Sequence, residues 1–526
     1  MGQLNQQERE ETLDKLIEEL APHIPENQQD SFRDFVYRYY SLDTWQDLMA
    51  INRRDLLGAT HSFWKFMQHH DPRQPKIEVI NPEHAHHGWH SGHTVIRILH
   101  RDMPFVVDSV RIKLNEYGST IHLLRNSVMH FRRDAKREMI HSDTPAEGEA
   151  LHREAIVYLE VDRCESQKEL NQLREQLQAV LADVARVVDD FESMTSRVRH
   201  LLEQMGSAEG DQHTTAREVQ AFLRWLLADN FTFLGYEELT VTEREGLRQI
   251  VRPTEALLGL LRPMHQGELG QLELEPFVEQ DFFEQKEWLS FSKASVRSSV
   301  HRPAYPDFIT VRRFDEQGRI LGEARIVGLY TSPVYRQTPY VIPYIRHKVE
   351  AIVLRSGLDP KSHHGKDLIQ VLEIFPRDEL FQTNQDELFE TAMSILRIQE
   401  RKQIKVFIRQ DPYGPFCSAL VYIPRDIYNT GFRHRVEKIL CQRLEAVDSE
   451  FTTYFSESIL ARVHFIFKLK DRIDYNLDII TQEIIEAASS WEDDLKAAVL
   501  ESFGEVKGNK LLAIFGDGFG AAYREA

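Results

Sequence analysis

The sequence near the C-terminal end alternates strand-like and helix-like segments, and this alternation restricts the fold more than any other feature. Ile404–Arg409 and Phe416–Ile423 are rich in β-branched and aromatic residues, and a loop containing Pro and Gly separates them, as in a β-hairpin. Asn429 is a helix-capping residue type, and apolar residues recur every fourth position after it. Two more strands, Phe451–Phe455 and Val463–Leu469, and a second amphipathic helix follow. The order ββαββα predicts one antiparallel sheet with helices on a single face, an α+β fold of ferredoxin-like kind.

A second α+β unit is expected nearer the N-terminus, beginning close to Ile77. Thr94–Leu99 is predicted to be a strand, and the helix that follows has start and stop signals at Asp102 and Gly118. Counted from that strand, the later segments complete a βαββαβ order, with Ala185–Phe191 as the last strand. The chain is therefore expected to contain two related sheets.

Four stretches of the sequence resemble the N-terminal region of the large NAD-specific glutamate dehydrogenases. They are Asp102-Met-Pro-Phe-Val-Val-Asp108, His301-Arg-Pro-Ala-Tyr-Pro-Asp307, Glu373-Ile-Phe-Pro-Arg-Asp-Glu-Leu-Phe381 and Arg409 through Thr430. In that family this region carries ACT-type domains, small modules that sense amino acids in many proteins, and the dehydrogenase domain lies far downstream. The resemblance implies that the chain is a fragment of a longer enzyme and stops before its catalytic domain.

The resemblance also implies where an effector would bind. Asp102, Phe105 and Gly118 occupy the first loop and helix of the first ACT-type unit, and Asp411 and Gly414 occupy the hairpin loop of the second. ACT domains that bind amino acids usually place a glycine where Phe105 stands, because the backbone must approach the ligand closely. A phenylalanine would fill that space. We therefore favour a structural or subunit-pairing role for this loop over amino-acid binding.

These patterns divide the chain into six expected parts. They are a helical N-terminal segment (1–75), a first ACT-type α+β domain (76–195), a helical linker (196–230), a middle α/β domain with an antiparallel sheet (231–400), a second ACT-type ferredoxin-like domain (401–500) and a truncated helical connector (501–526).

Composition excludes several classes of function. The chain has 526 residues, 42% of them hydrophobic, and no apolar run approaches the roughly 20 residues that a membrane helix needs. A net charge of −19 argues against binding nucleic acid, because that binding depends on clustered Lys and Arg. The N-terminus lacks a secretory signal, and three scattered cysteines, Cys164, Cys417 and Cys441, do not form a disulfide framework. We expect a cytoplasmic protein.

A histidine cluster is the densest group of metal-ligand types. His84, His86, His87, His90 and His93 all have side chains that suit zinc, copper or nickel. No carboxylate or cysteine accompanies them at the spacing of a metalloenzyme, and two glycines break the segment into loop. We therefore expect no native metal site here.

Two other motifs can be interpreted either as binding sites or as ordinary structural elements. Gly516-Asp-Gly518-Phe-Gly-Ala-Ala522 resembles a dinucleotide-binding turn, but too little sequence follows it for a βαβ unit, so a helix, loop and helix is the better interpretation. The middle domain concentrates cationic side chains that suit a small anion, although pairing with the many acids is the simpler explanation. These are Arg302, Arg312, Arg313, Arg325, Arg336, Arg346 and Arg377, interleaved with His301, His347, His363 and His364.

The sequence contains no recognisable active site, so we expect this chain to be catalytically inactive and to hold no cofactor. By resemblance, it is the regulatory and assembly region of an NAD-dependent glutamate dehydrogenase, an oxidoreductase that converts L-glutamate, NAD and water to 2-oxoglutarate, ammonia and NADH. Its implied partners are its own C-terminal catalytic domain, further copies of itself and an amino-acid effector. The alternative is a free-standing amino-acid sensor of ACT type, and a weaker third hypothesis is a metal-dependent hydrolase that uses the histidine cluster.

Self-association is expected from the edges of the sheets. Edge strands expose unpaired backbone groups, which proteins cover with another chain or guard with charge. The strand candidates Phe416–Ile423, Phe451–Phe455 and Thr120–Val128 carry few internal charges.

Overall fold

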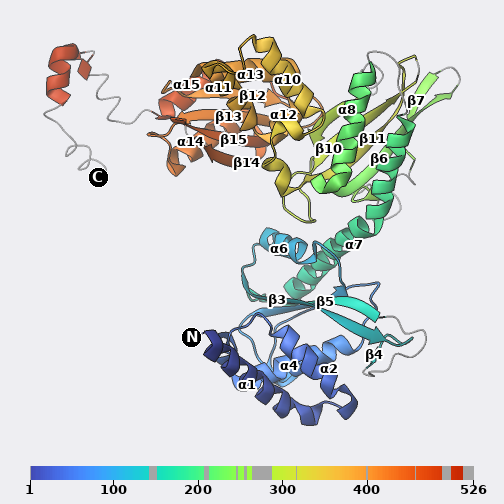
Figure 1. Ribbon diagram of the computed structural model, residues 1–526. Helices are drawn as coiled ribbons and strands as arrows, with labels where there is room; N and C mark the ends of the chain where they lie inside the picture. The colour runs from blue at the N-terminus through green and yellow to red at the C-terminus, as the bar shows by residue number, and fades with distance from the viewer. Residues whose placement is uncertain are drawn as a thin grey trace. The chain divides into compact units, whose positions relative to one another are not determined.

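The computed structural model of the chain describes residues 2–140, 151–205, 212–244, 247–253, 257–262, 287–315, 317–398, 401–456, 458–488, 499–500 and 502–512 (Figure 1). The chain divides into two compact units. The first contains Met1–Met194, Leu257–Gln271 and Val296–Tyr305, and the second contains the remaining residues. Within the part of the chain that is described, no helix is long and apolar enough to cross a membrane.

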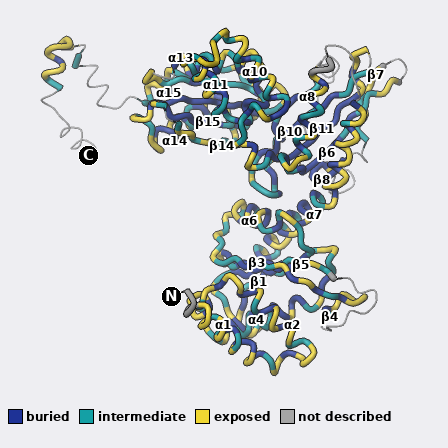
Figure 2. Tube along the Cα trace, viewed as in Figure 1, coloured by how far each residue is buried: buried dark blue, intermediate teal, exposed yellow. Residues whose placement is uncertain are grey.

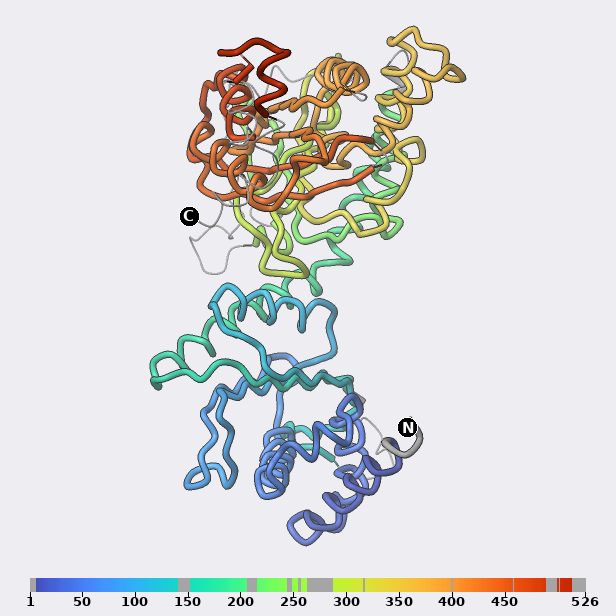
Figure 3. Tube along the Cα trace, turned by 90° about the vertical axis from the view of Figure 1, so that its left-hand side faces the viewer, coloured from blue at the N-terminus to red at the C-terminus, as the bar shows by residue number. Residues whose placement is uncertain are grey.

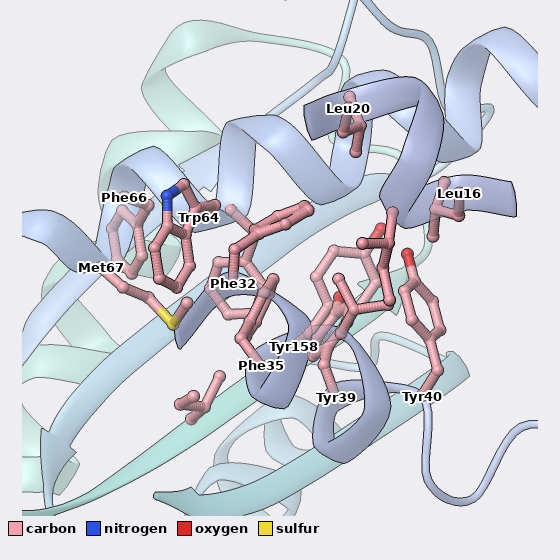
Figure 4. Packing of buried hydrophobic residues seen from close by; sticks show 14 of the residues in the cluster. Leu16, Leu20, Phe32, Phe35, Tyr39, Tyr40, Trp64, Phe66, Met67 and Tyr158 are labelled. Carbon is pink, nitrogen blue, oxygen red and sulfur yellow. The ribbon is translucent and has the colours of Figure 1, made fainter. Parts of the chain in front are cut away.

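The first unit opens with a layer of helices, as predicted. They are α1 (Gly2–Leu20), α2 (Gln29–Tyr39), α3 (Trp45–Ala50) and α4 (Arg53–Gln68), with short 3-10 turns at Ala21–His23 and Glu26–Gln28. Apolar residues at helical spacing face inward, and Phe32, Phe35 and Trp64 are each at most 2% exposed. Figure 4 shows these rings packed together with Tyr39 and with Tyr158 from the neighbouring sheet. Each buried aromatic side chain contributes about 2–3 kcal/mol to stability.

The first sheet has the strand order β1-β2-β5-β3-β4, and its paired strands are antiparallel. The strands are β1 (Lys76–Ile80), β2 (Thr94–Arg101), β3 (Ile121–Arg133), β4 (Met139–Ile140) and β5 (Leu151–Val161), with a short helix α5 (His84–His87) between β1 and β2. Helices α1–α4 cover one face, and α6 (Val106–Glu116) and α7 (Gln167–Gln204) lie on the other (Figures 1 and 3). All residues of β2 except Arg101 are buried, because both faces of this strand are covered.

The predicted strand at Ala185–Phe191 is wrong, because these residues lie inside α7, a continuous helix of 38 residues. Val184, Val187, Met194 and Val198 are buried at spacings of three, seven and four residues, which is the period of one helix face. The β-branched valines suggested a strand, but packing along one face outweighs their weak local preference. The first unit therefore has the order ββαββα apart from the two-residue β4, the same order as the second sheet of ACT type.

The second unit contains the predicted middle domain with its antiparallel sheet. Its strands in the order β7-β6-β11-β10-β9 are β7 (Leu247–Val251), β6 (Phe231–Arg244), β11 (Ile320–Tyr330), β10 (Asp307–Phe314) and β9 (Leu289–Lys293). The chain enters this sheet through α8 (Gln212–Trp225) and a turn at Leu226–Asn230. The two-residue strand β8 (Leu258–Gly259) belongs to the first unit.

Four helices follow the middle sheet. They are α10 (Ile345–Ser356), α11 (His363–Glu373), α12 (Arg377–Gln382) and α13 (Gln385–Ile398). The buried amine of Lys348 on α10 donates to the carbonyls of Leu380, Phe381 and Thr383, which end α12. These carbonyls have no partner within their own helix, so the lysine fastens the two helices together.

The last sheet confirms the predicted ββαββα order. Its elements are β12 (Lys405–Gln410), β13 (Phe416–Pro424), α14 (Thr430–Arg443), β14 (Ala446–Phe455), β15 (Leu460–Leu469) and α15 (Leu477–Ala488). The strand order is β12-β13-β15-β14, so the four strands expected in one sheet do share one. Asn429 caps α14 by accepting a hydrogen bond from the amide of Phe432. Phe416–Ile423 was expected at an edge, but β13 is central and lies between β12 and β15.

Both faces of this last sheet are covered. Helices α14 and α15 pack on one face, as predicted, and share a core with Val406, Val421 and Phe465. On the other face, Arg462 of β15 donates to the carbonyl of Ile374 at the end of α11, and Arg409 of β12 pairs with Glu379 of α12. Every residue of β13 is buried in consequence, and the strand is dark along its length in Figure 2.

Candidate functional site

The loop after β2 holds the first group of expected effector residues. The carboxylate of Asp102 lies 2.8 Å from the guanidinium of Arg153, and the amide of Asp102 donates to the carbonyl of the same residue. Gly118 follows the end of α6 with φ +77°, as the predicted stop signal requires. Asp102 and Gly118 lie at opposite ends of an 11-residue helix, which spans about 16 Å, so they do not converge on one ligand.

Phe105 adopts the left-handed backbone conformation that usually selects glycine, with φ 71°. Its ring lies 4.9 Å from the ring of His301, which belongs to the same unit and also has a left-handed backbone, with φ 73°. The amide of His301 donates to the hydroxyl of Ser109 on α6. The segment Val296–Tyr305 therefore packs on the loop that an ACT-type effector would be expected to use.

Asp411 and Gly414 lie in the second unit, in the loop between β12 and β13. Asp411 is 1% exposed, and its carboxylate accepts hydrogen bonds from the hydroxyl of Ser292 and the amide of Tyr413. Burial raises the pKa of Asp411. A Cβ on Gly414 would lie 3.0 Å from the same Ser292 hydroxyl, so the hairpin loop packs tightly on β9. This arrangement gives both residues a structural role.

The histidine cluster is dispersed. His84, His86 and His87 lie on the short helix α5, where His84 stacks on His90 with ring centroids 5.9 Å apart. His93 stacks instead on His122 of β3, at 4.2 Å. Among the residues that the structure describes, no group of three or more His, Cys, Asp or Glu side chains has the geometry of a metal site.

Several of the cationic side chains that would suit a small anion are paired with acids. Arg325 lies between Glu237 and Glu323, and Arg312 also faces Glu323. Arg346 pairs with Glu218 of α8. The simpler explanation offered by the sequence, pairing with nearby acids, therefore holds for these arginines.

Arg377 and Arg462 differ from the other buried arginines. Eight arginines are buried among the described residues, and the other six form ion pairs with carboxylates. Arg377 was expected to pair with a neighbouring acid, but it donates to the backbone carbonyls of Gln337, Phe375 and Glu373. Arg462 donates to one carbonyl, and its Nε is buried with no hydrogen-bond partner.

A buried Arg–Glu–His group joins the last sheet to α12. The guanidinium of Arg409 lies 2.9 Å from the carboxylate of Glu379, and His464 Nε2 lies 3.5 Å from the same carboxylate. Burial alone would raise the pKa of Glu379, but Arg409 and His464 together hold this pKa well below its ordinary value. His464 Nε2 also lies 3.0 Å from the hydroxyl of Ser418. Because one ring nitrogen faces both the hydroxyl and the acid, this group is not a nucleophile relay, which needs the two on opposite nitrogens.

The first sheet has a corresponding group. Glu154 of β5 lies 2.6 Å from the guanidinium of Arg133 and 2.8 Å from His70 Nδ1, just after α4. Burial would raise the pKa of Glu154, but the hydrogen bonds from His70 and Arg133 lower it. Arg133 also donates to the carbonyls of Met67 and Gln68, so the group ties the sheet to α4.

Two cavities of about 850 Å³ each lie in the second unit. One is lined by residues of α10, the α12–α13 turn and the β12–β13 loop, including Lys348 and Arg409. Burial lowers the pKa of the Lys348 ammonium to about 7. The other cavity lies between α11 and the last sheet and is lined by Arg462, Tyr422, Tyr454, Lys366 and other residues.

The fold defines a chain with two ACT-type domains, and family models match both of them. Residues 35–177 match the ACT1 domain of glutamate dehydrogenase, residues 405–492 match its ACT2 domain, and residues 342–401 match its helical motif 1. The helical motif corresponds to α10–α13.

Curated relatives carry the name NAD-specific glutamate dehydrogenase. The chain is 43% identical to that of Pseudomonas aeruginosa over 511 residues, which cover 96% of the chain and 32% of the relative. It is 39% identical to that of Halomonas elongata over 523 residues, or 98% of the chain and 32% of the relative. It is 29% identical to that of Mycobacterium tuberculosis over 440 residues, or 80% of the chain and 26% of the relative. The chain thus spans about a third of the length of the first two relatives.

The residues that the structure makes most unusual were not singled out from the sequence. Arg462 was not named as a candidate, and Glu379 appeared only within the stretch Glu373–Phe381. The signal for Arg462 was a basic residue between apolar residues in a strand that both faces bury. The glycine-rich motif at 516–522 lies outside the described residues, while residues 505–512 before it are helical, as expected for a connector.

Proposed function

We propose that this chain is the regulatory and assembly region of an NAD-specific glutamate dehydrogenase. The complete enzyme would convert L-glutamate, NAD and water to 2-oxoglutarate, ammonia and NADH in the cytoplasm. The observation that carries the proposal is 43% identity, over nearly the whole chain, with an enzyme of that name three times as long. Residues 1–526 would then be a fragment without the catalytic domain.

The buried polar groups of the chain support a role other than catalysis. The Arg–Glu–His groups at Glu154 and Glu379 are closed by their own partners and join sheets to helices. The thiol of Cys417 is 1% exposed, and burial raises its pKa to about 12, so it is not a nucleophile at neutral pH. The chain would contribute contacts between subunits and with its own catalytic domain.

The proposal predicts that the isolated chain neither binds NAD nor oxidises glutamate. Calorimetric titration of the 526-residue chain with NAD should give only heats of dilution, and no NADH absorbance should appear with glutamate. A saturable NAD site of micromolar affinity would contradict the assignment of cofactor binding to another part of the enzyme.

The coding sequence beyond Ala526 distinguishes this proposal from a free-standing sensor. We expect a long continuation that contains a dinucleotide-binding unit, and a stop codon directly after Ala526 would favour the sensor. In the complete enzyme, deletion of residues 1–500 should change the subunit number measured by light scattering. An unchanged assembly with unchanged kinetics would reject the regulatory and assembly role.

A further inference from the structure

Arg462 is a buried cation without an anion. Arg462 is 9% exposed, and no carboxylate in the described part of the chain forms an ion pair with it. It donates a hydrogen bond to the carbonyl of Ile374 and interacts with the side chain of Tyr422, and its Nε has no hydrogen-bond partner. Proteins rarely leave a buried charge in this state, because desolvation costs several kcal/mol unless an opposite charge offsets it.

The neighbouring strands hold this guanidinium in a fixed row. Arg462 on β15 pairs directly with Tyr422 on β13 and with Tyr454 on β14, so the three side chains lie on one face of the sheet. The guanidinium carbon lies 4.8 Å from the centre of the Tyr454 ring. Aromatic neighbours on both sides limit the orientations of the guanidinium.

The guanidinium lines a cavity of about 850 Å³, which is within the usual range for small-ligand sites. Across the cavity, α11 presents Lys366 and Asp367, and the loop after β14 presents Ser456 and Ser458. Val371 and Leu460 add apolar surface. The walls therefore combine two cations, hydroxyl donors, one acid and an apolar area.

A second arginine strengthens the positive charge of this region. Burial lowers the pKa of Arg377, the charge of Glu373 raises it, and the charge of Arg462 lowers it. Arg377 donates its hydrogen bonds to backbone carbonyls. The region thus holds two buried guanidinium groups that form no ion pair with a carboxylate of the described chain, whereas the other buried arginines of the described chain have carboxylate partners.

We propose that the cavity between α11 and the last sheet binds a small organic carboxylate, whose carboxylate group pairs with the Arg462 guanidinium. The aromatic and apolar walls suit an organic body, and Asp367 disfavours a phosphate dianion. Asp367 also provides a partner for the ammonium group of an amino acid. The site is distinct from the loop at Phe105 and from the hairpin loop at Asp411, and the proposal does not depend on the dehydrogenase assignment.

Calorimetric titration of the 526-residue chain tests the proposal. The probes are a panel of L-amino acids, their 2-oxo-acid counterparts and inorganic phosphate. We expect saturable binding of at least one carboxylate and a weaker affinity, by about tenfold or more, in Arg462→Met, because a charged hydrogen-bonded pair is lost. Arg435→Met is the matched control, since Arg435 is exposed on α14 and outside the cavity, and it should bind like the native chain.

Two further variants identify the ligand class. Lys366 is exposed, so Lys366→Gln should fold normally and weaken carboxylate binding by a few fold. Asp367→Asn should weaken amino acids and strengthen oxo acids if the ammonium group faces Asp367. The absence of carboxylate binding at millimolar concentration, with or without phosphate binding, would overturn the proposal, as would equal affinity in native chain and Arg462→Met.

The stability of the ligand-free chain separates this site from a purely structural arginine. We expect Arg462→Met to melt at the same temperature as the native chain or higher, because it removes an uncompensated buried charge. If Arg462→Met does not fold, Arg462 is needed for folding, and two other measurements test the proposal. Lys366→Gln should weaken binding, and the ligand should slow amide exchange in β15 of the native chain. Failure of both measurements would overturn it.

Discussion

The two ACT-type sheets share a topology but treat their buried arginines differently. Both follow the order ββαββα, and the strand orders β1-β2-β5-β3 and β12-β13-β15-β14 correspond strand by strand. Each has a helical layer over its second face, joined to the sheet by a buried Arg–Glu–His group. In the first domain, Arg97, Arg125 and Arg133 all pair with carboxylates, whereas in the second, Arg462 does not.

This difference separates what the fold requires from what it permits. A closed Arg–Glu–His group occurs in both domains, so it belongs to the joint between sheet and helices. Among the described residues of the two domains, a buried arginine without a carboxylate partner occurs only in the second domain, so the joint does not require it. The two ACT-type domains thus share one topology, but the buried arginines of the first domain have carboxylate partners, whereas Arg462 of the second domain has none in the part of the chain that is described.

The largest effect on stability should come from disrupting the two buried Arg–Glu–His groups, at Glu154 and at Glu379. Glu379→Gln and Glu154→Gln each leave a buried arginine without its counter-ion, and we expect each to lower the free energy of unfolding by about 3–5 kcal/mol. Hydrogen exchange followed by mass spectrometry measures this loss for each domain separately.

The matched control is Glu19→Gln, which breaks the exposed ion pair with Arg53. It should change stability by less than about 0.5 kcal/mol, since exposed pairs contribute little. If Glu154→Gln behaved like this control while Glu379→Gln did not, the two joints would not be equivalent.

Acid should weaken both domains through the same carboxylates. The folded pKa of Glu154 and of Glu379 lies below the ordinary value of 4.5, so both groups stabilise the folded chain above that pH. Their contribution is lost as the pH falls from about 4.5 through the lowered folded pKa. Denaturant unfolding followed between pH 6 and pH 2 should show the decrease, and the Gln variants should flatten it.

Self-association should depend on the edge strand β14. Val447 and Phe451 of this strand are 61% and 46% exposed, and helices cover both faces of the sheet, so the edge is the open apolar surface. We predict that the chain associates and buries on the order of 800 Å² per partner. Val447→Lys should shift the equilibrium toward monomer in light scattering coupled to size exclusion. A monomeric mass for the native chain across a hundredfold dilution range would reject the prediction.

The smallest effect on stability concerns the residue that precedes α6 in the first domain and α14 in the second. In the second domain Asn429 caps α14 with its side chain, so Asn429→Ala should cost about 1 kcal/mol in urea unfolding. In the first domain Phe105 makes no side-chain cap and carries left-handed strain, so Phe105→Gly should be close to neutral as lost ring packing offsets relieved strain. A large cost for Phe105→Gly would show that its contact with His301 stabilises the loop.

The fold followed from the sequence where local pattern and packing agree. The alternation in Val463–Leu469 and the cap at Asn429 predicted the second sheet, and the stop signal at Gly118 predicted the end of α6. Prediction failed at Ala185–Phe191, where valines suited to strands lie on one face of a long helix.

The candidate site was less predictable, because it depends on which charges remain unpaired. Composition showed many arginines and acids, but not that Arg325 would find two carboxylates and Arg462 none. Pairing of this kind joins residues far apart in sequence, such as Arg409 and Glu379 or His70 and Glu154. Short-range patterns contain no information on such contacts.

The helical layer over the second face of each sheet determines where the chain can be cut. A piece that began at Lys405 would contain all of the last sheet but would expose Tyr422, which lies beside residues of α11 and α13. A piece that began at Lys76 would likewise lose the helices that cover Leu99 and Tyr158. The smallest autonomous unit is therefore a set of helices together with the sheet that follows it, and soluble fragments should begin near residue 1 or near residue 342.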